Sequence, residues 1–379
     1  MAGHDVTGVV TAHADSTAGI GPPGDHGPAD PAPTGAPVGC DRADREGREA
    51  AELAGGATLA VGGGDRARGE KPDRWRTCFE RDRDRILHAT AFRRLAGKTQ
   101  VFVFPDDHQR TRLTHALEVA QVACGIARAC RLNVALTEAI ALGHDCGHGP
   151  GGHASEDALS PYVEGGYDHA TWGADVSLAR LNLCRETLDG IRNHSWSRPA
   201  PSTPEGEVVS WADRIAYVCH DFEDAVTSGV VTPAVLPALV RERCGERRSQ
   251  QLGTFIDAMV ATVLSTGRIG MDPGHAEALA AFRACNYEQL YLRPSSVAQG
   301  RAVIEVLRAL VEHYGDRPDQ MDDGDPGREV PVGGSPEAFR AAVAYVGGMT
   351  DRYAFDRAVE VLGWSPEKLP VGIGVSPGG

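Results

Sequence analysis

From Trp75 onward, apolar residues recur in this chain at the spacing of one helix face. Residues 111–130 are the clearest case, because their apolar members follow one stripe while most charged residues fall elsewhere. The members of this stripe are Leu113, Leu117, Ala120, Cys124 and Ala127. A second helix is expected from Val134 to about Asp145, with Asn133 as its N-cap. Later helices are expected at 255–265, 276–285, 297–313 and 337–348. No stretch alternates apolar and polar residues as a half-buried strand does, so we predict an all-α fold.

A glycine-rich loop follows the second of these helices. The residues that prevent the helix from continuing are Gly147, Gly149, Pro150, Gly151 and Gly152. His144 and Asp145 are therefore left at a helix C-terminus. A further helix is expected to begin near Ser210, which stands three residues before Asp213 in the outline of a capping box. Its buried face comprises Ile215, Cys219, Phe222 and Val226.

The first part of the chain differs in composition. Residues 1 to about 70 are rich in Gly, Ala, Pro and Asp, and they contain almost no large apolar side chains. Such a segment cannot offset its ordering entropy by burial. We therefore predict a disordered extension over 1–70, one helical domain over 71–364 and a flexible tail over 365–379.

Charge and cysteine content limit the partners and the compartment. The formal net charge is -14, and an acidic surface repels a polyanion, so a phosphate site must be a local basic pocket. The nine cysteines include no C-x-x-C pair and are odd in number, which suits a reducing compartment. No basic segment precedes an apolar stretch at the N-terminus, and no apolar run reaches the roughly 18 residues needed to span a bilayer. We predict a cytoplasmic protein without a membrane partner.

The adjacent pair His144 and Asp145 indicates a metal. It follows the apolar run 139–142, which would place the carboxylate near the core, where a buried charge needs a partner. Adding His115 from the preceding helix and Asp213 from a later one gives two imidazoles and two carboxylates. This mixed set suits Mn²⁺ or Fe²⁺, with Mg²⁺ as the alternative. Such a metal polarises a phosphoryl oxygen and lowers the pKa of bound water, as phosphate hydrolysis requires.

Longer stretches resemble the dGTP triphosphohydrolase family of HD-domain proteins. They are DRDRILHATAFRRLAGKTQVFVF (82–104), RTRLTHALEVAQV around His115 and EAIALGHDCGHGPGGHASE around His144. Further matches are RETLDGIRNH (185–194), ADRIAYVCHDFEDA (212–225) and GGMTDRYA (347–354). The resemblance covers roughly 71–364, and it implies an HD-domain helical bundle with additional C-terminal helices.

The resemblance also implies roles for single residues. The family's metal ligands fall on the same four positions, His115, His144, Asp145 and Asp213. The catalytic histidine and glutamate of the family loop correspond to His153 and Glu156. A histidine with a pKa near neutrality can protonate the leaving 5′-oxygen, and a carboxylate three residues away can hold its tautomer.

Six further positions match family residues that contact the substrate. Arg112, on the same helical face as His115, corresponds to an arginine that binds the triphosphate. His148 and His169 match histidines that line the site, and phosphate contacts are their expected role. The remaining three are Tyr217 and Asp221, four and eight residues after Asp213, and Gln100, which matches a glutamine that reads the sugar 3′-hydroxyl.

The chain departs from the family pattern at two places. The family loop reads like GHTPFGH, whereas this loop lacks the aromatic residue, which should loosen the loop that carries His153. Ala170 replaces the usual polar residue after His169. Both departures bear on rate and base preference more than on the type of reaction.

These observations favour an enzyme that hydrolyses deoxynucleoside triphosphates, dGTP among them, to a deoxynucleoside and inorganic tripolyphosphate. The alternatives are an HD phosphohydrolase acting on a nucleoside monophosphate or cyclic nucleotide, and a nucleotide-binding regulator without activity. A single-strand nucleic-acid binder would draw on the eight Lys or Arg against four Asp or Glu in 71–94, but the net charge disfavours it. The resemblance further implies a homo-oligomer.

Overall fold

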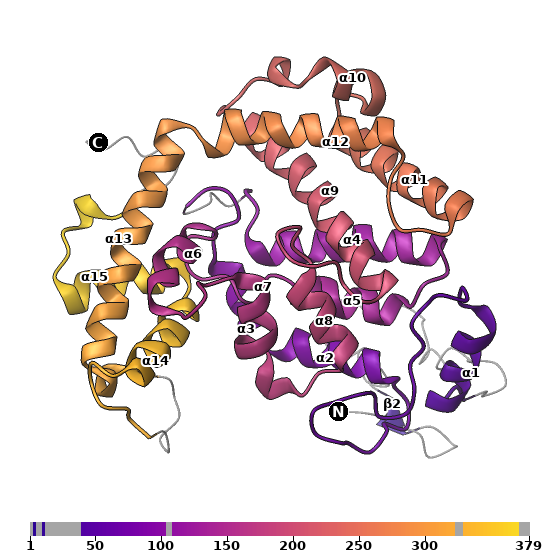
Figure 1. Cartoon of the computed structure of the whole chain (residues 1–379), viewed down its shortest axis with the longest axis horizontal. Coiled ribbons are helices and arrows are strands. Elements are labelled where there is room, and N and C mark those ends of the chain that lie inside the picture. Colours follow the sequence, from indigo (N-terminus) through magenta and orange to yellow (C-terminus); the bar gives the residue numbers. More distant parts are fainter. Residues whose placement is uncertain (1–2, 5–9, 12–38, 104–107, 323–328, 371–379) are drawn as a thin grey trace, which may run out of the picture. The chain divides into compact units, whose positions relative to one another are not determined.

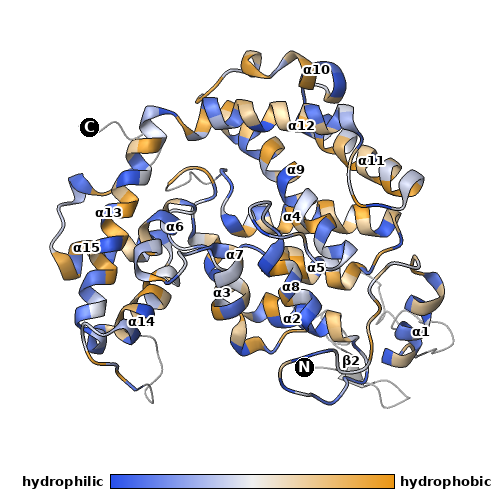
Figure 2. Ribbon diagram, viewed as in Figure 1, coloured by the Kyte–Doolittle hydropathy of each residue, from blue (hydrophilic) through white to orange (hydrophobic). Residues whose placement is uncertain are grey.

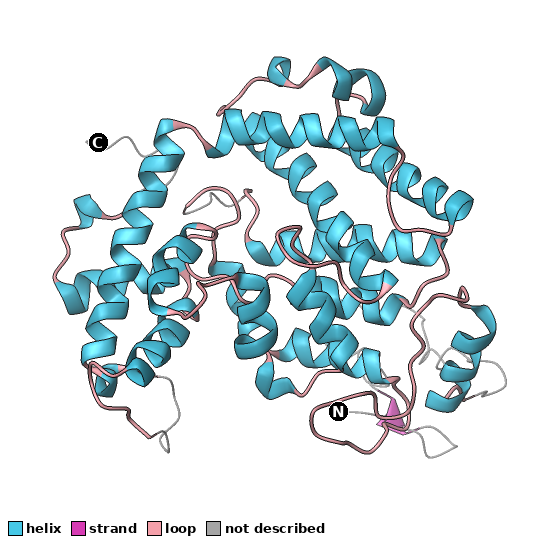
Figure 3. Cartoon of the chain, in the orientation of Figure 1, coloured by secondary structure: helices cyan, strands magenta, loops and turns pink. Residues whose placement is uncertain are grey.

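The computed structural model describes residues 3–4, 10–11, 39–103, 108–322 and 329–370. The chain divides into two compact units, Met1–Cys40 and Asp41–Gly379. In the first unit, the described strands β1 (Gly3–His4) and β2 (Val10–Thr11) pair antiparallel, with Gly3 opposite Thr11. In the second unit, the described residues form fifteen α-helices joined by loops and short 3-10 or π-helical turns (Figure 3). The predicted all-α class is confirmed.

Most of the helices share one large apolar core, and α5 is its innermost element. These helices are α2 (Cys78–His88), α3 (Thr90–Arg94), α4 (Arg112–Ala129), α5 (Val134–Gly143), α8 (Arg185–Asn193), α9 (Pro204–Thr227), α10 (Ala238–Cys244), α11 (Arg248–Thr266) and α12 (Pro273–Asn286) (Figure 1). Helix α5 contacts α2, α4, α8 and α9. Its residues 136–143 are buried except for Glu138. A helix that is apolar on nearly every side belongs in the interior, which explains why the other helices surround α5.

Helices α5 and α8 approach each other closely at Gly190. A Cβ atom at Gly190 would lie 2.4 Å from the Cδ1 of Ile140, so only glycine permits this spacing. The ends of the two helices are brought together as a result, and the ring centroids of His144 and His194 are 4.9 Å apart.

The C-terminal helices build a second apolar core. Helices α13 (Pro294–Asp316), α14 (Pro336–Gly347) and α15 (Asp351–Leu362) pack together, and α6 (Ala154–Leu159) packs against α13. Each of these helices carries both apolar and polar residues, as an amphipathic helix does (Figure 2). Because α6 directly follows the glycine-rich loop, this core fixes one end of that loop.

The predicted disordered extension is wrong for its second half. Residues Arg42–Glu52 form helix α1. Glu46 and Glu49 of this helix accept hydrogen bonds from backbone N–H groups of the segment that follows. Arg66 is buried and forms an ion pair with Asp82 at 2.5 Å. Polar contacts therefore hold this segment, which a count of large apolar side chains could not detect.

Two helix predictions also need correction. Helix α9 begins after the N-cap Thr203, whose side chain accepts a hydrogen bond from the backbone three residues on, and Ser210 lies inside the helix. In α4, Ala120, Cys124 and Ala127 of the predicted stripe are buried, but Leu117 is 49% exposed. Arg112, which was expected off the stripe, is buried. Helices α5, α9 and α11 enclose the other sides of α4, so its buried surface extends beyond one apolar stripe.

The predicted tail is shorter than expected among the described residues. The 3-10 helix η8 (Pro366–Lys368) continues the chain, and Leu369 packs against the second core. Residues 371–379, and most of residues 1–38, lie outside the described residues. Across the part of the chain that is described, no helix combines the length and the apolar character needed to cross a membrane.

Candidate active site

His144 ends helix α5 with one ring nitrogen lacking a partner. Its Nδ1 donates a hydrogen bond to the carbonyl oxygen of Ala141 at 2.7 Å, so in the neutral ring the lone pair lies on Nε2. This Nε2 is fully buried and makes no hydrogen bond to any residue that the structure describes. A buried polar atom is rarely left in this state, so it indicates a ligand.

Three further side chains converge on this nitrogen. The Nε2 of His144 lies 3.4 Å from an oxygen of Asp145 and 3.7 Å from an oxygen of Asp213. The Nε2 of His115 lies 3.0 Å from the same Asp213 oxygen and 4.0 Å from Asp145. Donor atoms this close suit a divalent metal, whose bonds to imidazole nitrogen or carboxylate oxygen are about 2.0–2.2 Å long. The four side chains that the sequence singled out can therefore hold a metal.

The surroundings of Asp145 and Asp213 keep both carboxylates ionised, as metal ligands must be. Burial alone would raise the pKa of Asp213, but its hydrogen bond with His115 and the nearby His144 hold this pKa below its usual range. Burial opposes ionisation of Asp145 as well, and Arg112 and the neighbouring histidines outweigh it and hold its pKa well below the usual range.

Arg112 contacts Asp145 and also has guanidinium N–H donors without an acceptor. Its Nη1 donates to Asp145 at 2.7 Å, and its side chain is almost wholly buried. Its Nε and Nη2 find no acceptor within the described ranges. Two buried guanidinium donors beside a metal site would bind an anionic group of a ligand, such as a phosphate.

The glycine-rich loop lies directly against helix α7 (His169–Trp172). A Cβ atom at Gly147 would lie 2.0 Å from the carbonyl oxygen of His169, so the contact requires glycine. The approach places the ring of His148 on that of His169, with centroids 3.7 Å apart. The Nε2 of His148 lies 3.2 Å from Asp145, which connects the loop to the metal ligands.

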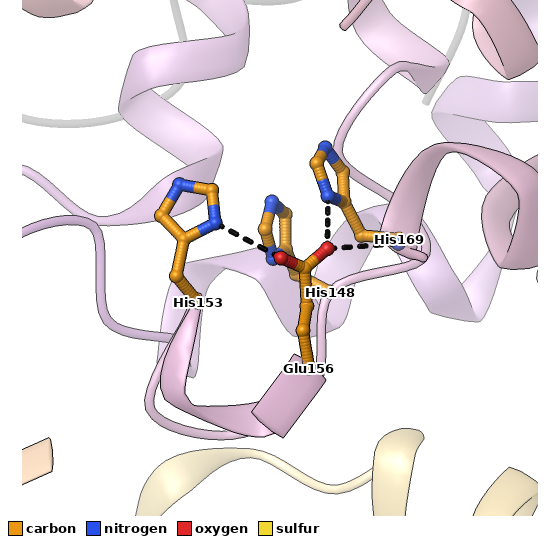
Figure 4. A group of neighbouring side chains, drawn as sticks. All are labelled: His148, His153, Glu156 and His169. Carbon is orange, nitrogen blue, oxygen red and sulfur yellow. Dashed lines mark hydrogen bonds and ion pairs between the residues drawn. The ribbon is translucent and has the colours of Figure 1, made fainter. Parts of the chain in front are cut away.

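His148, His153, Glu156 and His169 form one group around the Glu156 carboxylate (Figure 4). His169 donates to Glu156 from its Nδ1 at 2.5 Å and from its backbone N at 3.0 Å. The Nδ1 of His153 lies farther away, at 3.4 Å, and its side chain is 73% exposed. Glu156 therefore contacts His169 more closely than it contacts His153, although the sequence predicted a contact with His153 alone.

Lys98 and Asp351 anchor the loop from the other side. Asp351, in the C-terminal motif, accepts hydrogen bonds from the Thr99 backbone at 2.9 Å, from the Thr99 hydroxyl at 2.5 Å and from the Gly151 backbone at 2.8 Å. Lys98 donates to the carbonyl oxygens of His148 and of α14. Polar contacts from Lys98 and Asp351 thus hold the loop that lacks the family's aromatic residue.

Tyr217 and Asp221 contact a different set of residues. Tyr217 accepts a hydrogen bond from Arg283 of α12 at 2.9 Å. Asp221 is buried and accepts one from Tyr291, in the π-helical turn η6 (Tyr287–Tyr291). Burial raises the pKa of Asp221 to about 7. Apart from their polar side chains, nothing in the sequence predicted that Arg283 and Tyr291 contact Tyr217 and Asp221.

The predicted sugar contact, Gln100, follows directly on Thr99, which Asp351 holds. Its Oε1 is buried without a partner in the described parts of the chain.

His194, at the end of α8, is a buried histidine for which the motifs predicted no role. Its Nδ1 donates to the carbonyl oxygen of Ile191 at 2.8 Å, as the Nδ1 of His144 does to Ala141. Its Nε2 faces the Nε2 of His169 at 3.2 Å. The available signal was its place at the end of the motif RETLDGIRNH, at a helix C-terminus like His144.

Comparison with known proteins agrees with this geometry. The HD domain matches residues 112–218, and the phosphohydrolase-associated domain matches residues 269–360. The deoxyguanosinetriphosphate triphosphohydrolase-like protein of Caldanaerobacter subterraneus is 40% identical over 79% of this chain and 89% of its own length. Its counterpart in Syntrophus aciditrophicus is 34% identical, over 82% and 94%. This chain belongs to the same family. The family resemblance predicted from the motifs is confirmed.

As a member of the deoxyguanosinetriphosphate triphosphohydrolase-like family, the chain is a phosphohydrolase. The HD match runs from the first residue of α4 into α9 and includes all four candidate metal ligands. The phosphohydrolase-associated match includes α13, α14 and Asp351 of α15. Among solved structures, a phosphohydrolase from Bacteroides thetaiotaomicron VPI-5482 is similar at 18% identity and a TM-score of 0.47, over 74% of this chain and 68% of that one.

Proposed function

We propose that this protein hydrolyses deoxynucleoside triphosphates between the α-phosphorus and the 5′-oxygen, releasing a deoxynucleoside and inorganic tripolyphosphate. The observation that carries the proposal is that Nε and Nη2 of Arg112 are buried without an acceptor, while its Nη1 is bonded to Asp145. Arg112 supplies a site for a phosphate chain beside a set of metal donors and an imidazole–carboxylate group. The names of the family's relatives agree with this substrate class.

His115, His144, Asp145 and Asp213 would hold the metal, for which Mn²⁺ or Fe²⁺ is favoured and Mg²⁺ is the alternative. When bound, the metal supplies Lewis acidity toward a phosphoryl oxygen and a water molecule. The protein's own part is to keep both carboxylates ionised, and Arg112 does this for Asp145.

His153 is the proton donor to the departing 5′-oxygen in this proposal. Its exposed side chain stands on the glycine-rich loop next to the buried imidazoles, so it can reach a substrate without leaving a packed position. Glu156 orients its ring, and His148 and His169 contact the phosphates.

The remaining predicted contacts concern the nucleoside. Gln100 would read the 3′-hydroxyl through its unpaired carbonyl oxygen. Tyr217 and Asp221 lie on the face of α9 that turns toward α12, and they would line the sugar pocket.

Product analysis tests the proposal. The full chain loaded with Mn²⁺ is incubated with each of the four deoxynucleoside triphosphates, and products are separated by anion exchange and identified by ³¹P NMR. We expect tripolyphosphate and the deoxynucleoside, and none with the control Asp145→Ala, which excludes a contaminating phosphatase. Release of orthophosphate or pyrophosphate from every substrate would overturn the proposed cleavage site.

A further inference from the structure

Two buried thiols, those of Cys78 and Cys184, lie together beneath a glycine of the segment that precedes α2. A Cβ atom at Gly64 would lie 2.4 Å from the sulfur of Cys184 and 3.4 Å from the sulfur of Cys78, so only glycine leaves room for both. Gly64 itself is partly exposed. The two sulfurs therefore lie directly under the backbone of a residue that solvent reaches.

The two thiols differ in how readily they lose a proton. Cys78 is the first residue of α2, where the helix N-terminus favours a negative charge. The hydrogen bond from the Cys184 thiol outweighs burial and lowers the pKa of Cys78, and the charge of Arg66 acts in the same direction. The same hydrogen bond, together with burial, raises the pKa of the Cys184 thiol. Cys78 is thus the nucleophile of the pair, and Cys184 keeps its proton.

Polar contacts fix the backbones that carry both sulfurs. Arg66 donates to the carbonyl oxygen of Cys78 at 2.9 Å, and Asp82 accepts from the backbone N–H of Cys184 at 2.8 Å. Arg66 and Asp82 form an ion pair with each other, and both side chains are fully buried. This ion pair therefore connects the starts of α2 and α8, and it brings the two thiols within reach of each other.

We propose that Cys78 and Cys184 are a redox-active pair, which a peroxide converts into a disulfide that joins the starts of α2 and α8 and stabilises the fold between them. In a reducing compartment the pair stays as two thiols and reacts when an oxidant appears. The reacting atoms are not part of the metal site, so the inference is independent of the proposed substrate.

Oxidation by hydrogen peroxide takes two steps. The Cys78 thiolate attacks one peroxide oxygen, the O–O bond breaks, and Cys78 becomes a sulfenic acid as hydroxide leaves. The Cys184 sulfur then attacks the sulfenic sulfur, so that the S–O bond breaks and an S–S bond forms. The sulfenic hydroxyl leaves with the Cys184 proton as water. Together the two thiols lose two protons and two electrons, and one hydrogen peroxide becomes two water molecules.

The disulfide would close a loop of about 100 residues, from the start of α2 to the N-cap of α8. This loop contains α4, α5 and the glycine-rich loop, and with them His115, His144 and Asp145. A crosslink over this length strongly restricts the unfolded chain, so Tm of the oxidised protein should rise by up to about 7 °C. A dithiol would restore both thiols by exchange.

Thiol counting and peptide mapping on the full chain test the pair. The reduced protein is treated with hydrogen peroxide, the remaining thiols are blocked with N-ethylmaleimide under denaturing conditions, and proteolytic peptides are mapped by mass spectrometry. We expect two peptides joined through Cys78 and Cys184 and the loss of two of the nine thiols. Dithiothreitol should restore all nine.

Two serine variants separate the roles of the two thiols. Cys184→Ser lacks the second thiol, so Cys78 should accumulate as a sulfenic acid that dimedone traps, and the rise in Tm should vanish. Cys78→Ser should give no dimedone adduct at Cys184. The matched control is Cys124→Ser, at another buried cysteine, whose sulfur donates to the carbonyl oxygen of Val134. This control should still form the disulfide.

Nine free thiols in the peroxide-treated wild type would overturn the proposal, as would a disulfide mapped to any other pair. Equal dimedone labelling of the two serine variants would overturn the assignment of Cys78 as the nucleophile. A Tm of the oxidised wild type at or below that of the reduced protein would overturn the stabilising role. The mapping of the wild type needs no substitution, so it decides the matter even where a variant fails to fold.

Discussion

The substitution Asp351→Asn should disturb the position of the glycine-rich loop and lower kcat, while it leaves KM for the substrate nearly unchanged. In the native chain, one oxygen of Asp351 accepts from both the backbone and the hydroxyl of Thr99, and the other accepts from the Gly151 backbone. An amide can replace only one of these oxygens, and its NH₂ then faces N–H donors on the other side. The substitution leaves at least one buried donor unpaired.

The magnitude follows from that lost partner. A buried donor without an acceptor costs about 1–3 kcal/mol, and the backbone bonds here go to a charged group, so about 2–3 kcal/mol is expected. With an unfolding entropy of about 2.1 cal/mol/K per residue, a domain of some 330 residues would lose roughly 3–4 °C in Tm. Because Gly151 lies two residues before His153, a shift of the loop should lower kcat by about ten- to a hundredfold and change KM by less than about threefold.

Calorimetry and steady-state kinetics measure both effects. The control is Asp356→Asn, which makes the same change at an exposed position of α15 and should alter neither Tm nor kcat. A fall in Tm without a change in kcat would show that Asp351 stabilises the fold but does not position the loop. An unchanged Tm and kcat would refute the reasoning altogether.

Four further predictions concern the site. Asp145→Ala should lose bound metal and hydrolysis together, and full metal occupancy of this variant by mass spectrometry would contradict its role as a ligand. His153→Ala should lose most of its turnover while still binding Mn²⁺ and nucleotide in calorimetric titrations, and an unchanged rate would remove it from the mechanism. In the wild type, burying an unpaired 2′-hydroxyl should cost about 1–3 kcal/mol, so we expect kcat/KM for dGTP to exceed that for GTP by about ten- to a hundredfold. Gln100→Ala should reduce this ratio. Equal kcat/KM values for the two nucleotides on the wild type would refute a deoxyribose-selective site. In the folded state, burial raises the pKa of Asp221 to about 7. The unfolding free energy of the metal-free wild type should therefore fall, relative to that of Asp221→Asn, as pH rises from about 4 to 7. Urea titrations that give parallel pH profiles for the two proteins would contradict this.

Local spacing was sufficient to predict the main helices. The stretch 111–130 and the helix capped by Asn133 appear as α4 and α5, because apolar periodicity and an N-cap act within a few residues. The true start of α9 was missed because Thr203 and Pro204 precede its apolar pattern and a false cap, Ser210, lies within it. Residues 42–70 were misread because their ordering depends on single polar contacts such as that of Arg66 with Asp82.

By itself, the sequence determined the helical class, the family and the set of side chains from which a metal site can be built. These depend on residue types and on short spacings, which the chain carries in its own order. Only the tertiary structure decided that Glu156 sits closest to His169 and that His194 faces His169 across 3.2 Å. It also decided that Asp351 holds a loop two hundred residues earlier in the chain. Such contacts arise where helices pack at separations set by small residues such as Gly147 and Gly190, and no spacing along the chain encodes them.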